Sequence, residues 1–451
     1  MAWLIWLIAA LFYGVEFFQR VSPTVMAKPI MHSFGIDATV LSSITALYLY
    51  AYAIAQIPVG VLLDRFGVRR PLALACLAIS LGSLLFALSH HLVFLGIARI
   101  LIGFGSAFAF IGTLKLVSSW FPATFYPVMV GLTNTLGVLG AIAGEGPFAA
   151  LINRIGWENS LIVISVIGLG ICGLIYAFVK DHPLCLKHPE NCEQLLRRQQ
   201  DHSVTRIVTD VIASKQTWLT ACYASLMVTP IIAFAELWGV PFLQAAYHLS
   251  SVTAANINTA IFIGIGVGGP VNGLLARVFK RRKAVMVIGN LMALGLLCIV
   301  LYGQHIPLTL LFVCMFAFGF FTSSMLLAFT INKQNHPESH NATVVAVTNM
   351  VIMLMGALYQ PVIGFLLDHL LPHRTGQYHL IDYEHALTLL PITLGVTLIL
   401  LWFISGRFNY QSAPLTTKQP MPFPLPVWVF YILMIYEACH SAGPLSSTVL
   451  L

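Results

Sequence analysis

Twelve apolar stretches, each long enough to cross a lipid bilayer as a helix, run through the sequence and limit what it can fold into. A bilayer core about 30 Å thick needs roughly 20 helical residues to cross it. Membrane-barrel strands are shorter and alternate polar with apolar residues, so these stretches predict helices. They lie near residues 3–27, 40–63, 71–89, 93–116, 125–151, 158–179, 217–246, 253–276, 284–303, 308–331, 342–367 and 386–405. The sequence therefore predicts an all-α polytopic membrane protein with twelve transmembrane helices.

The charged residues support this prediction and indicate an orientation. Asp, Glu, Lys and Arg make up 9% of the chain, whereas a soluble protein carries about 25% because its surface must be wetted. Most Lys and Arg residues fall on the inner side when the N-terminus is placed in the cytoplasm, as in other membrane proteins. No basic face carries the interleaved aromatics of a nucleic-acid-binding surface. We expect a monomer in a lipid bilayer, the bacterial inner (plasma) membrane, without a nucleic-acid partner.

Internal repeats divide the chain into two similar halves. The polar segment 180–216 separates an N-terminal half, 1–179, from a C-terminal half, 217–406, and a tail, 407–451, follows. The pair Thr133-Asn134 recurs as Thr348-Asn349, and Gly103 has a counterpart in Gly319. A finer repeat relates the ends of the second and eleventh stretches, Gln56–Asp64 and Gln360–Asp368. Two six-helix halves, each built from two inverted triplets, are typical of transporters.

The cysteines and histidines predict no cofactor or metal site. His182, Cys185, His188 and Cys192 have roughly metal-ligand spacing in the central loop. A solvated connecting loop is the favoured interpretation, and zinc binding is the alternative. The apolar run Val427–Cys439 in the tail is short for a membrane span. We expect it to lie at the surface or the membrane interface.

The loop after the second stretch carries a family resemblance. Gly60-Val-Leu-Leu-Asp64-Arg65-Phe-Gly67-Val-Arg69-Arg70 closely resembles the cytoplasmic signature of the major facilitator superfamily. The fourth stretch, with Arg99 followed by small residues, resembles a second signature of that family. The resemblance implies two pseudo-symmetric halves whose first, fourth, seventh and tenth helices line a cavity. It also implies a conformational latch, which would comprise Gly60, Asp64, Arg65, Gly67, Arg69 and Arg70. Gly60 is expected to allow close helix packing, and Gly67 a tight turn.

Ionisable residues inside the stretches are candidates for function. Each costs roughly 2.5–3.5 kcal/mol to place at the centre of a membrane helix. Glu16, Arg20, Arg99, Glu145 and Glu236 are the five such residues. We assign Arg20 to substrate binding, and Glu16, Arg99 and Glu236 to proton coupling. Glu145 lies toward the end of its stretch, which favours solvation at the interface.

Two of these assignments have structural alternatives. Glu16 and Arg20 are four residues apart and share one helix face, so they can also be a pair that only neutralises itself. Arg99 can be structural, bonded to backbone carbonyls at a helix crossing. The string Glu16–Pro23 resembles the first helix of organic-anion and sugar-phosphate permeases, which carry a substrate arginine there. Those permeases have a second arginine in the seventh helix, where this chain offers Glu236.

Uncharged polar and aromatic residues at cavity depth complete the predicted substrate site. They are Tyr48, Tyr52, Asn134, Trp238, Asn349 and Tyr359. Ordinary packing is the alternative for each of them, although Asn134 and Asn349 are also symmetry mates in the repeat.

Together these features predict a secondary active transporter. It would move a small organic solute, anionic or zwitterionic, by alternating access and coupled to protons. An amino-acid or dipeptide carrier like the lysosomal dipeptide transporter, or a drug efflux pump, is the alternative. A receptor or scaffold would gain nothing from buried charges. The chain carries no nucleotide loop and no nucleophile elbow, so we expect no enzyme and no catalytic residues.

Overall fold

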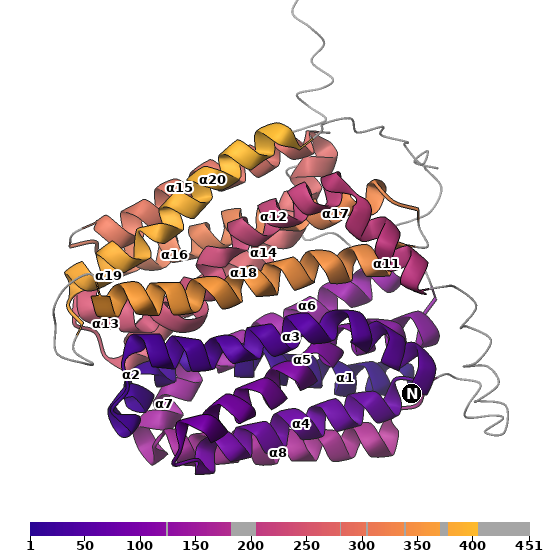
Figure 1. The fold of residues 1–451 in the computed structure, drawn as a ribbon, viewed down its shortest axis with the longest axis horizontal. Helices are drawn as coiled ribbons and strands as arrows, with labels where there is room; N and C mark the ends of the chain where they lie inside the picture. Colours follow the sequence, from indigo (N-terminus) through magenta and orange to yellow (C-terminus); the bar gives the residue numbers. More distant parts are fainter. Residues whose placement is uncertain are drawn as a thin grey trace, which may run out of the picture. The chain divides into compact units, whose positions relative to one another are not determined.

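The computed structural model describes residues 1–122, 125–181, 204–279, 281–303, 305–337, 340–369 and 378–404. The side chains of residues 57, 61, 64, 127, 204–207, 341 and 342 are not described. Within this part of the chain, 12 helices, some of them interrupted, are long and apolar enough to cross a membrane. The prediction of twelve transmembrane helices is therefore confirmed (Figure 1). Residues 1–405 form one compact unit. The tail and most of the central loop lie outside the described residues.

The described residues of the N-terminal half form eight α-helices. They are α1 (Ala2–Val21), α2 (Pro23–Phe34), α3 (Ala38–Phe66), α4 (Arg69–Leu88), α5 (Leu92–Trp120), α6 (Tyr126–Ala143), α7 (Gly146–Ile155) and α8 (Trp157–Phe178). The predicted first span, 3–27, ends earlier than expected because α2 begins at Pro23, a residue that suits the first turn of a new helix. The fifth span is broken at Gly144 and Glu145, between α6 and α7.

The C-terminal half, together with the helix α11 in the polar segment 180–216, makes up the rest of the described chain. Its elements are α11 (Val204–Ala213), α12 (Lys215–Pro230), the π-helix η3 (Ile231–Trp238), α13 (Gly239–Tyr247), α14 (Ser251–Val278), α15 (Arg282–Tyr302), α16 (Leu308–Thr322), the 3-10 helix η4 (Ser323–Met325), α17 (Leu326–Gln334), α18 (Asn341–His369), α19 (Leu380–Leu387) and α20 (Leu389–Phe403). The seventh span thus changes to a wider helix after Pro230, which has no N–H to continue the α-helical pattern.

Glycines allow matching helix crossings in the two halves. A Cβ at Gly103 of α5 would collide with the backbone of Tyr48 on α3. A Cβ at Gly319 of α16 would collide with the backbone of Ile261 on α14. Small residues let membrane helices approach this closely. The sequence repeat of Gly103 and Gly319 is therefore also a repeat in packing.

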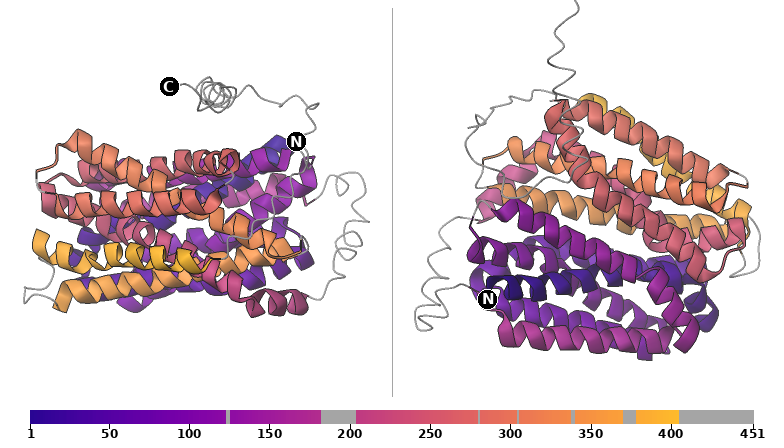
Figure 2. Two further views of the ribbon diagram at one scale, coloured as in Figure 1. Left: turned by 90° about the horizontal axis from the view of Figure 1, so that it is seen from above. Right: turned by 180° about the vertical axis from the view of Figure 1, so that it is seen from behind.

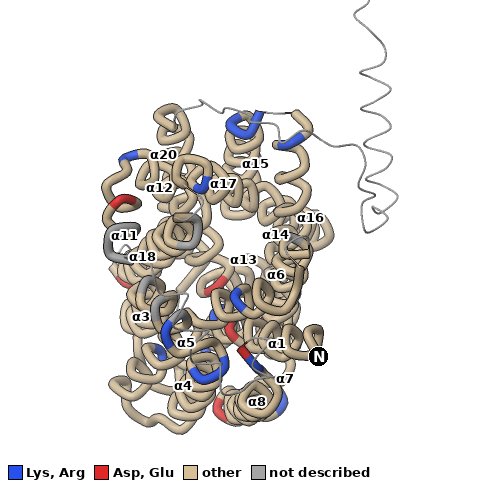
Figure 3. Tube along the Cα trace, turned by 90° about the vertical axis from the view of Figure 1, so that its right-hand side faces the viewer, with Lys and Arg blue, Asp and Glu red and all other residues tan. Residues whose placement is uncertain are grey.

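The halves meet along two seams and also where α2 contacts η3 and α13. In Figures 1 and 2 the helices of the N-terminal half lie together beside those of the C-terminal half. α3 packs against α18, and α6 and α7 pack against α14. The polar centre of the molecule lies between these two seams, where Figure 3 shows charged segments inside the ring of helices.

Hydrogen bonds hold the halves together at the end of the bundle where α3 and α14 begin, which we call the closed end. There Asp368, at the end of α18, accepts hydrogen bonds from the backbone N–H of Thr39 at 2.8 Å and of Ala38 at 3.3 Å. Asn153 of α7 donates to Ser251 of α14 at 3.2 Å. At the opposite end, a Cβ at Gly60, Gly131 or Gly273 would meet open space. The expectation that Gly60 provides close helix packing is therefore wrong in this conformation.

Candidate functional site

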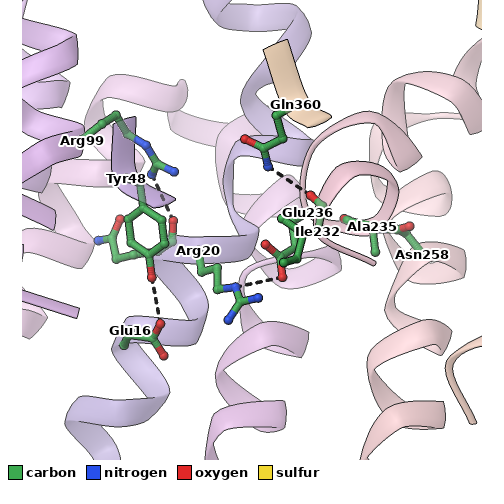
Figure 4. A network of polar contacts seen from close by, with 10 residues as sticks. Glu16, Arg20, Tyr48, Arg99, Ile232, Ala235, Glu236, Asn258 and Gln360 are labelled. Atoms are coloured by element: carbon green, nitrogen blue, oxygen red, sulfur yellow. Dashed lines mark hydrogen bonds and ion pairs between the residues drawn. The ribbon is translucent and has the colours of Figure 1, made fainter. Parts of the chain in front are cut away.

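Four of the intramembrane charges come together in the interior. Glu16 and Arg20 lie on α1, Arg99 on α5 and Glu236 on η3, so both halves contribute (Figure 4). The side chains of Glu16, Glu236 and Arg99 are 1%, 3% and 4% exposed. Burial of this depth demands a partner for each charge, because an unpaired ion in an apolar interior is costly.

Arg20 pairs across the two halves. Its Nε lies 2.9 Å from Oε1 of Glu236 (Figure 4), and its guanidinium also lies 5.5 Å from the ring centre of Phe17. Glu16, although four residues from Arg20 on the same helix, makes no ion-pair contact with it among the described residues. Glu236 is therefore the anion in ion-pair contact with Arg20, and the alternative of a self-neutralising Glu16–Arg20 pair stays a prediction. Sequence spacing placed both side chains on one face, but the closer anion comes from η3.

Tyr48 links Glu16 to Arg99. The hydroxyl of Tyr48 donates to Oε1 of Glu16 at 2.8 Å, and the guanidinium of Arg99 lies 4.9 Å from the centre of the Tyr48 ring. Arg99 Nη1 also donates to the backbone oxygen of Gln19 at 3.2 Å, and the Gln19 side chain bonds Ser83. This is the helix-crossing role expected for Arg99 as a structural residue. Its role in proton coupling stays a prediction.

Two amide side chains position the turn that carries Glu236. Gln360 of α18 donates to the carbonyl of Ile232 at 3.0 Å, and Asn258 of α14 donates to the carbonyl of Ala235 at 2.8 Å (Figure 4). A π-helix often marks a functional site. Sequence reasoning missed both residues as site residues. Their signal was present, since each is a buried amide inside an apolar stretch and Gln360 begins the repeat of Gln56.

The remaining predicted substrate residues fall into two groups. Trp238 is fully buried, and its Nε1 has no hydrogen-bond partner in the described part of the chain. Tyr52 is buried beside Tyr48 and lies within hydrogen-bonding reach of Asn349. Tyr359 instead accepts a hydrogen bond from Thr393 of α20 at 2.9 Å, and Asn134 is exposed on α6. These two are not part of the charged cluster.

The signature loop is organised by an aspartate that sequence reasoning did not single out. Asp181 accepts hydrogen bonds from the backbone N–H of Val68 at 2.6 Å and of Arg69 at 2.8 Å. The expected tight turn is confirmed at Gly67, whose φ of 75° suits glycine. Arg69 donates to the carbonyl of Tyr176 at 3.0 Å.

Other members of the predicted latch are less constrained. Arg65 and Arg70 are exposed, and Arg65 lies over the ring of Phe66. The side chain of Asp64 lies outside the described residues.

Glu145 corrects another expectation. It is 0% exposed, and Asn258 Nδ2 donates to its Oε1 at 2.6 Å. Interface solvation is therefore wrong for this residue, because α14 of the other half covers it.

The predicted alternative zinc ligands, His182, Cys185, His188 and Cys192, lie outside the described residues. Within those that are described, no group of His, Cys, Asp or Glu side chains could hold a metal ion.

Comparisons with known proteins agree with this architecture. The sequence matches the profile of the Major Facilitator Superfamily over residues 5–358 and 232–443. It is 27% identical over 361 residues to the hexuronate transporter of Bacillus subtilis, which is 78% of each chain. It is 22% identical to the probable galactarate/D-glucarate transporter GudP of the same organism, over 65% of this chain and 70% of that protein.

Two further matches are shorter or more distant. The transporter YybO of Bacillus subtilis is 31% identical, but the alignment spans only 36% of this chain and 38% of that protein. A bacterial homolog of the human lysosomal transporter Spinster, in an inward-facing and occupied conformation, superimposes with a TM-score of 0.73. It has 14% sequence identity, and the match covers 90% of this chain and 97% of that chain. At that identity the likeness shows the fold alone.

The family profile spans most of the chain, and the relatives reported are transporters and not enzymes. The chain is thus an integral multi-pass membrane protein, and it belongs to the major facilitator superfamily.

Proposed function

We propose that this protein is a proton-coupled secondary transporter for small organic anions that bear a carboxylate. The observation that carries the proposal is the ion pair between Arg20 and Glu236, which joins the two halves. A guanidinium keeps its charge at any physiological pH and holds a carboxylate through two parallel hydrogen bonds. A substrate carboxylate can therefore replace Glu236 on Arg20 when Glu236 takes up a proton.

This exchange couples the two ligands. When Glu236 is ionised it occupies Arg20, and when it is protonated Arg20 is available for the substrate. Binding of an anion and of a proton then occur together, and the net charge around Arg20 is unchanged. Glu16 lies close by, with Oε1 held by Tyr48 at 2.8 Å, and supplies a second carboxylate for proton exchange. Arg99 and Tyr48 hold α1, α3 and α5 around the site.

The relatives support the choice of a substrate class. The hexuronate transporter and the probable galactarate/D-glucarate transporter are named for sugar acids. Arginine opposite a carboxylate is the chemistry that such solutes require. We assign sugar acids as the first class to test, with uptake into the cytoplasm across a bacterial inner membrane. In this assignment the N-terminus is cytoplasmic, the closed end faces outward and the protein acts as a monomer.

A zwitterionic solute is the second candidate. Oε2 of Glu16 is buried and has no donor among the described residues. A buried acceptor of this kind suits a substrate ammonium, while Arg20 would bind the carboxylate of the same molecule. An amino acid or dipeptide fits this pattern.

Uptake into proteoliposomes tests the proposal. Purified protein is reconstituted, an inward proton gradient is imposed, and labelled glucuronate, galactarate, an amino acid and a dipeptide are offered in parallel. We expect uptake of a sugar acid that collapses when a protonophore is added. Uptake that is indifferent to the protonophore excludes proton coupling, and uptake of the amino acid or dipeptide alone selects the second candidate.

A further inference from the structure

Glu145 occupies a position that the proposed site does not use. It lies at the break between α6 and α7 and is 0% exposed. Although it precedes the first turn of α7, its side chain makes no capping hydrogen bond to that helix. Instead the side chain meets α14 of the other half, where Asn258 Nδ2 donates to Oε1 at 2.6 Å. The carboxyl group is therefore enclosed at the seam between the halves.

Among the described residues, no cation lies within ion-pair distance of the Glu145 carboxyl group. Charged groups on the elements around it are Glu16, Arg20, Lys28, Arg154, Glu158, Glu236 and Arg277, of which Arg277 is exposed in the last turn of α14. Arg20 is paired with Glu236, and Glu16 is bonded by Tyr48. Lys28, Arg154 and Glu158 are exposed. Across the described residues, Asn258 is the one group that interacts with the Glu145 side chain. An isolated buried carboxylate is costly, and such groups bind a proton instead.

The hydrogen-bonding inventory also requires a further donor. Glu145 Oε2 and Asn258 Oδ1 are both buried and have no partner among the described side chains and backbone. Both atoms are acceptors when Glu145 is ionised. A proton on Glu145 Oε2 removes the charge and turns one of these two acceptors into a donor.

The pair of Glu145 and Asn258 is connected both to the closed end and to the proposed substrate site. Asn258 Nδ2 bonds Glu145 and also the carbonyl of Ala235, the residue before Glu236. The next residue, Gly146, is packed so closely against Asn256 of α14 that a Cβ would collide with it. At the end of α7, Asn153 bonds Ser251 of α14 at the closed end. Separation of α7 from α14 would break the contacts that Glu145, Gly146 and Asn153 make with α14, and it would admit water to Glu145.

We propose that Glu145 is a proton-binding residue whose protonation is required for α7 and α14 to come together at the closed end. When the halves separate there, water reaches the carboxyl group and the proton is released to the side that has opened. Closure at this end then takes up a proton at Glu145. The inference rests on the proposed alternating access, because it needs a state in which α7 and α14 are apart.

The sign of the pH effect follows directly. The closed state binds one more proton at Glu145 than the open state, so raising the pH favours opening of the closed end. Glutamine at this position keeps the shape and the acceptor oxygen but never ionises. The Glu145→Gln variant should therefore close equally well at every pH.

Cross-linking of Asn153→Cys to Ser251→Cys reports closure without any substrate. Cleavage at a protease site introduced into the central loop yields two fragments, which run apart on a denaturing gel unless the cross-link joins them. The same protein without the two new cysteines corrects for reaction of the native thiols. With Glu145, we expect the cross-linked fraction to fall as the pH rises. With Glu145→Gln or Glu145→Ala, we expect no fall, and with Glu145→Asp the fall should return. Thiol reagents react faster at high pH. The measured quantity is therefore the cross-linked fraction of the protein with Glu145 divided by that of the Glu145→Gln variant at the same pH.

Two results overturn the inference, and both can be separated from failure of the proposed function. A ratio that does not change with pH shows that Glu145 does not control closure. A pH dependence that survives in both the Gln and Ala variants assigns the control to another group. If the Gln variant does not fold, the Ala and Asp variants make the same comparison. Sugar-acid uptake is measured in parallel with the unaltered protein. Absence of that uptake, with the pH dependence of cross-linking as expected, overturns the proposed function and leaves the role of Glu145 intact.

Discussion

Arg20 Nε lies 2.9 Å from Oε1 of Glu236, and this ion pair connects α1 of one half to the π-helix η3 of the other. The two residues are 216 positions apart in sequence (236 − 20). Gln360 and Asn258 hold the turn that carries Glu236. The pair is therefore both a contact between the halves and a place where an anion is already bound to an arginine.

Replacing Arg20 with lysine should weaken substrate binding although the charge is kept. Lysine cannot offer the parallel donors that hold a carboxylate in one orientation. Loss of one charge-assisted hydrogen bond costs about 1.5–3 kcal/mol, which weakens binding roughly ten- to 150-fold. The measurement is the affinity for the transported sugar acid by thermal shift or calorimetry. Arg154→Lys, at an exposed position on α7, is the matched control and should bind normally. Equal affinity of the two variants would remove Arg20 from the site.

The ion pair between Arg20 and Glu236 should also affect the thermal stability of the protein. Arg20→Gln leaves Glu236 buried without its partner, a change that costs about 3–5 kcal/mol for buried pairs. The double variant Arg20→Gln/Glu236→Gln removes both charges and should be more stable than Arg20→Gln, yet inactive in transport. Thermal unfolding in detergent measures the first effect and proteoliposome uptake the second. Full uptake by the double variant would mean that the charges serve only each other.

Glu236→Gln should separate transport from the proton gradient. Glutamine cannot exchange a proton, and it leaves Arg20 permanently available to an anion. We expect solute exchange between the two sides to persist, while uptake no longer rises when the outside is made acidic. Counterflow in proteoliposomes with and without a pH gradient measures both properties. Gradient-driven uptake that is unchanged in the variant would transfer the coupling role to another carboxylate.

Asp368→Ala should weaken the closed end. Asp368 accepts hydrogen bonds from the first backbone N–H groups of α3, at 2.8 Å from Thr39. Loss of such a cap costs about 0.5–2 kcal/mol, so the fraction of protein cross-linked between positions 153 and 251 should fall. Asp37→Ala is the control, because Asp37 caps the same helix from within its own half, at 2.8 Å from Val40 N. The Asp37 variant should lose stability without loss of closure, and an equal loss of closure would argue against a latch at Asp368.

His336, beyond the end of α17, should make the stability of the C-terminal half depend on pH. Burial and the neighbouring His340 lower the pKa of His336 below its usual value of 6.5, and its Nε2 lies 2.6 Å from Oγ1 of Thr217. Because the folded pKa is depressed, the neutral form is favoured, and stability is lost as the pH falls below about 6.5. His336→Gln should reduce this loss. Thermal unfolding of both proteins between pH 7 and pH 5 gives the comparison, and parallel curves would contradict it.

The breaks within the spans show where sequence patterns stop being informative. A stretch such as 125–151 is apolar over most of its length, so it predicts one unbroken membrane helix. The chain instead divides at Gly144 and Glu145. Hydropathy measures how well a segment suits lipid and contains no information about the partner helix. The partner here, α14, belongs to the other half and provides Asn258 to the carboxyl group.

The sequence by itself determined the number of spans, the two halves and the family. Backbone polar groups in lipid must bond within their own helix, so long apolar stretches allow little other than helices. The repeat likewise paired Gly103 with Gly319, and the structure places both at equivalent helix crossings. Only the tertiary structure decided that Arg20 pairs with Glu236 and not Glu16, that Glu145 is enclosed, and that Tyr359 contacts α20. The reason is physical: a charge is neutralised by whichever group packs closest in space, and packing joins residues from halves that sequence spacing cannot relate.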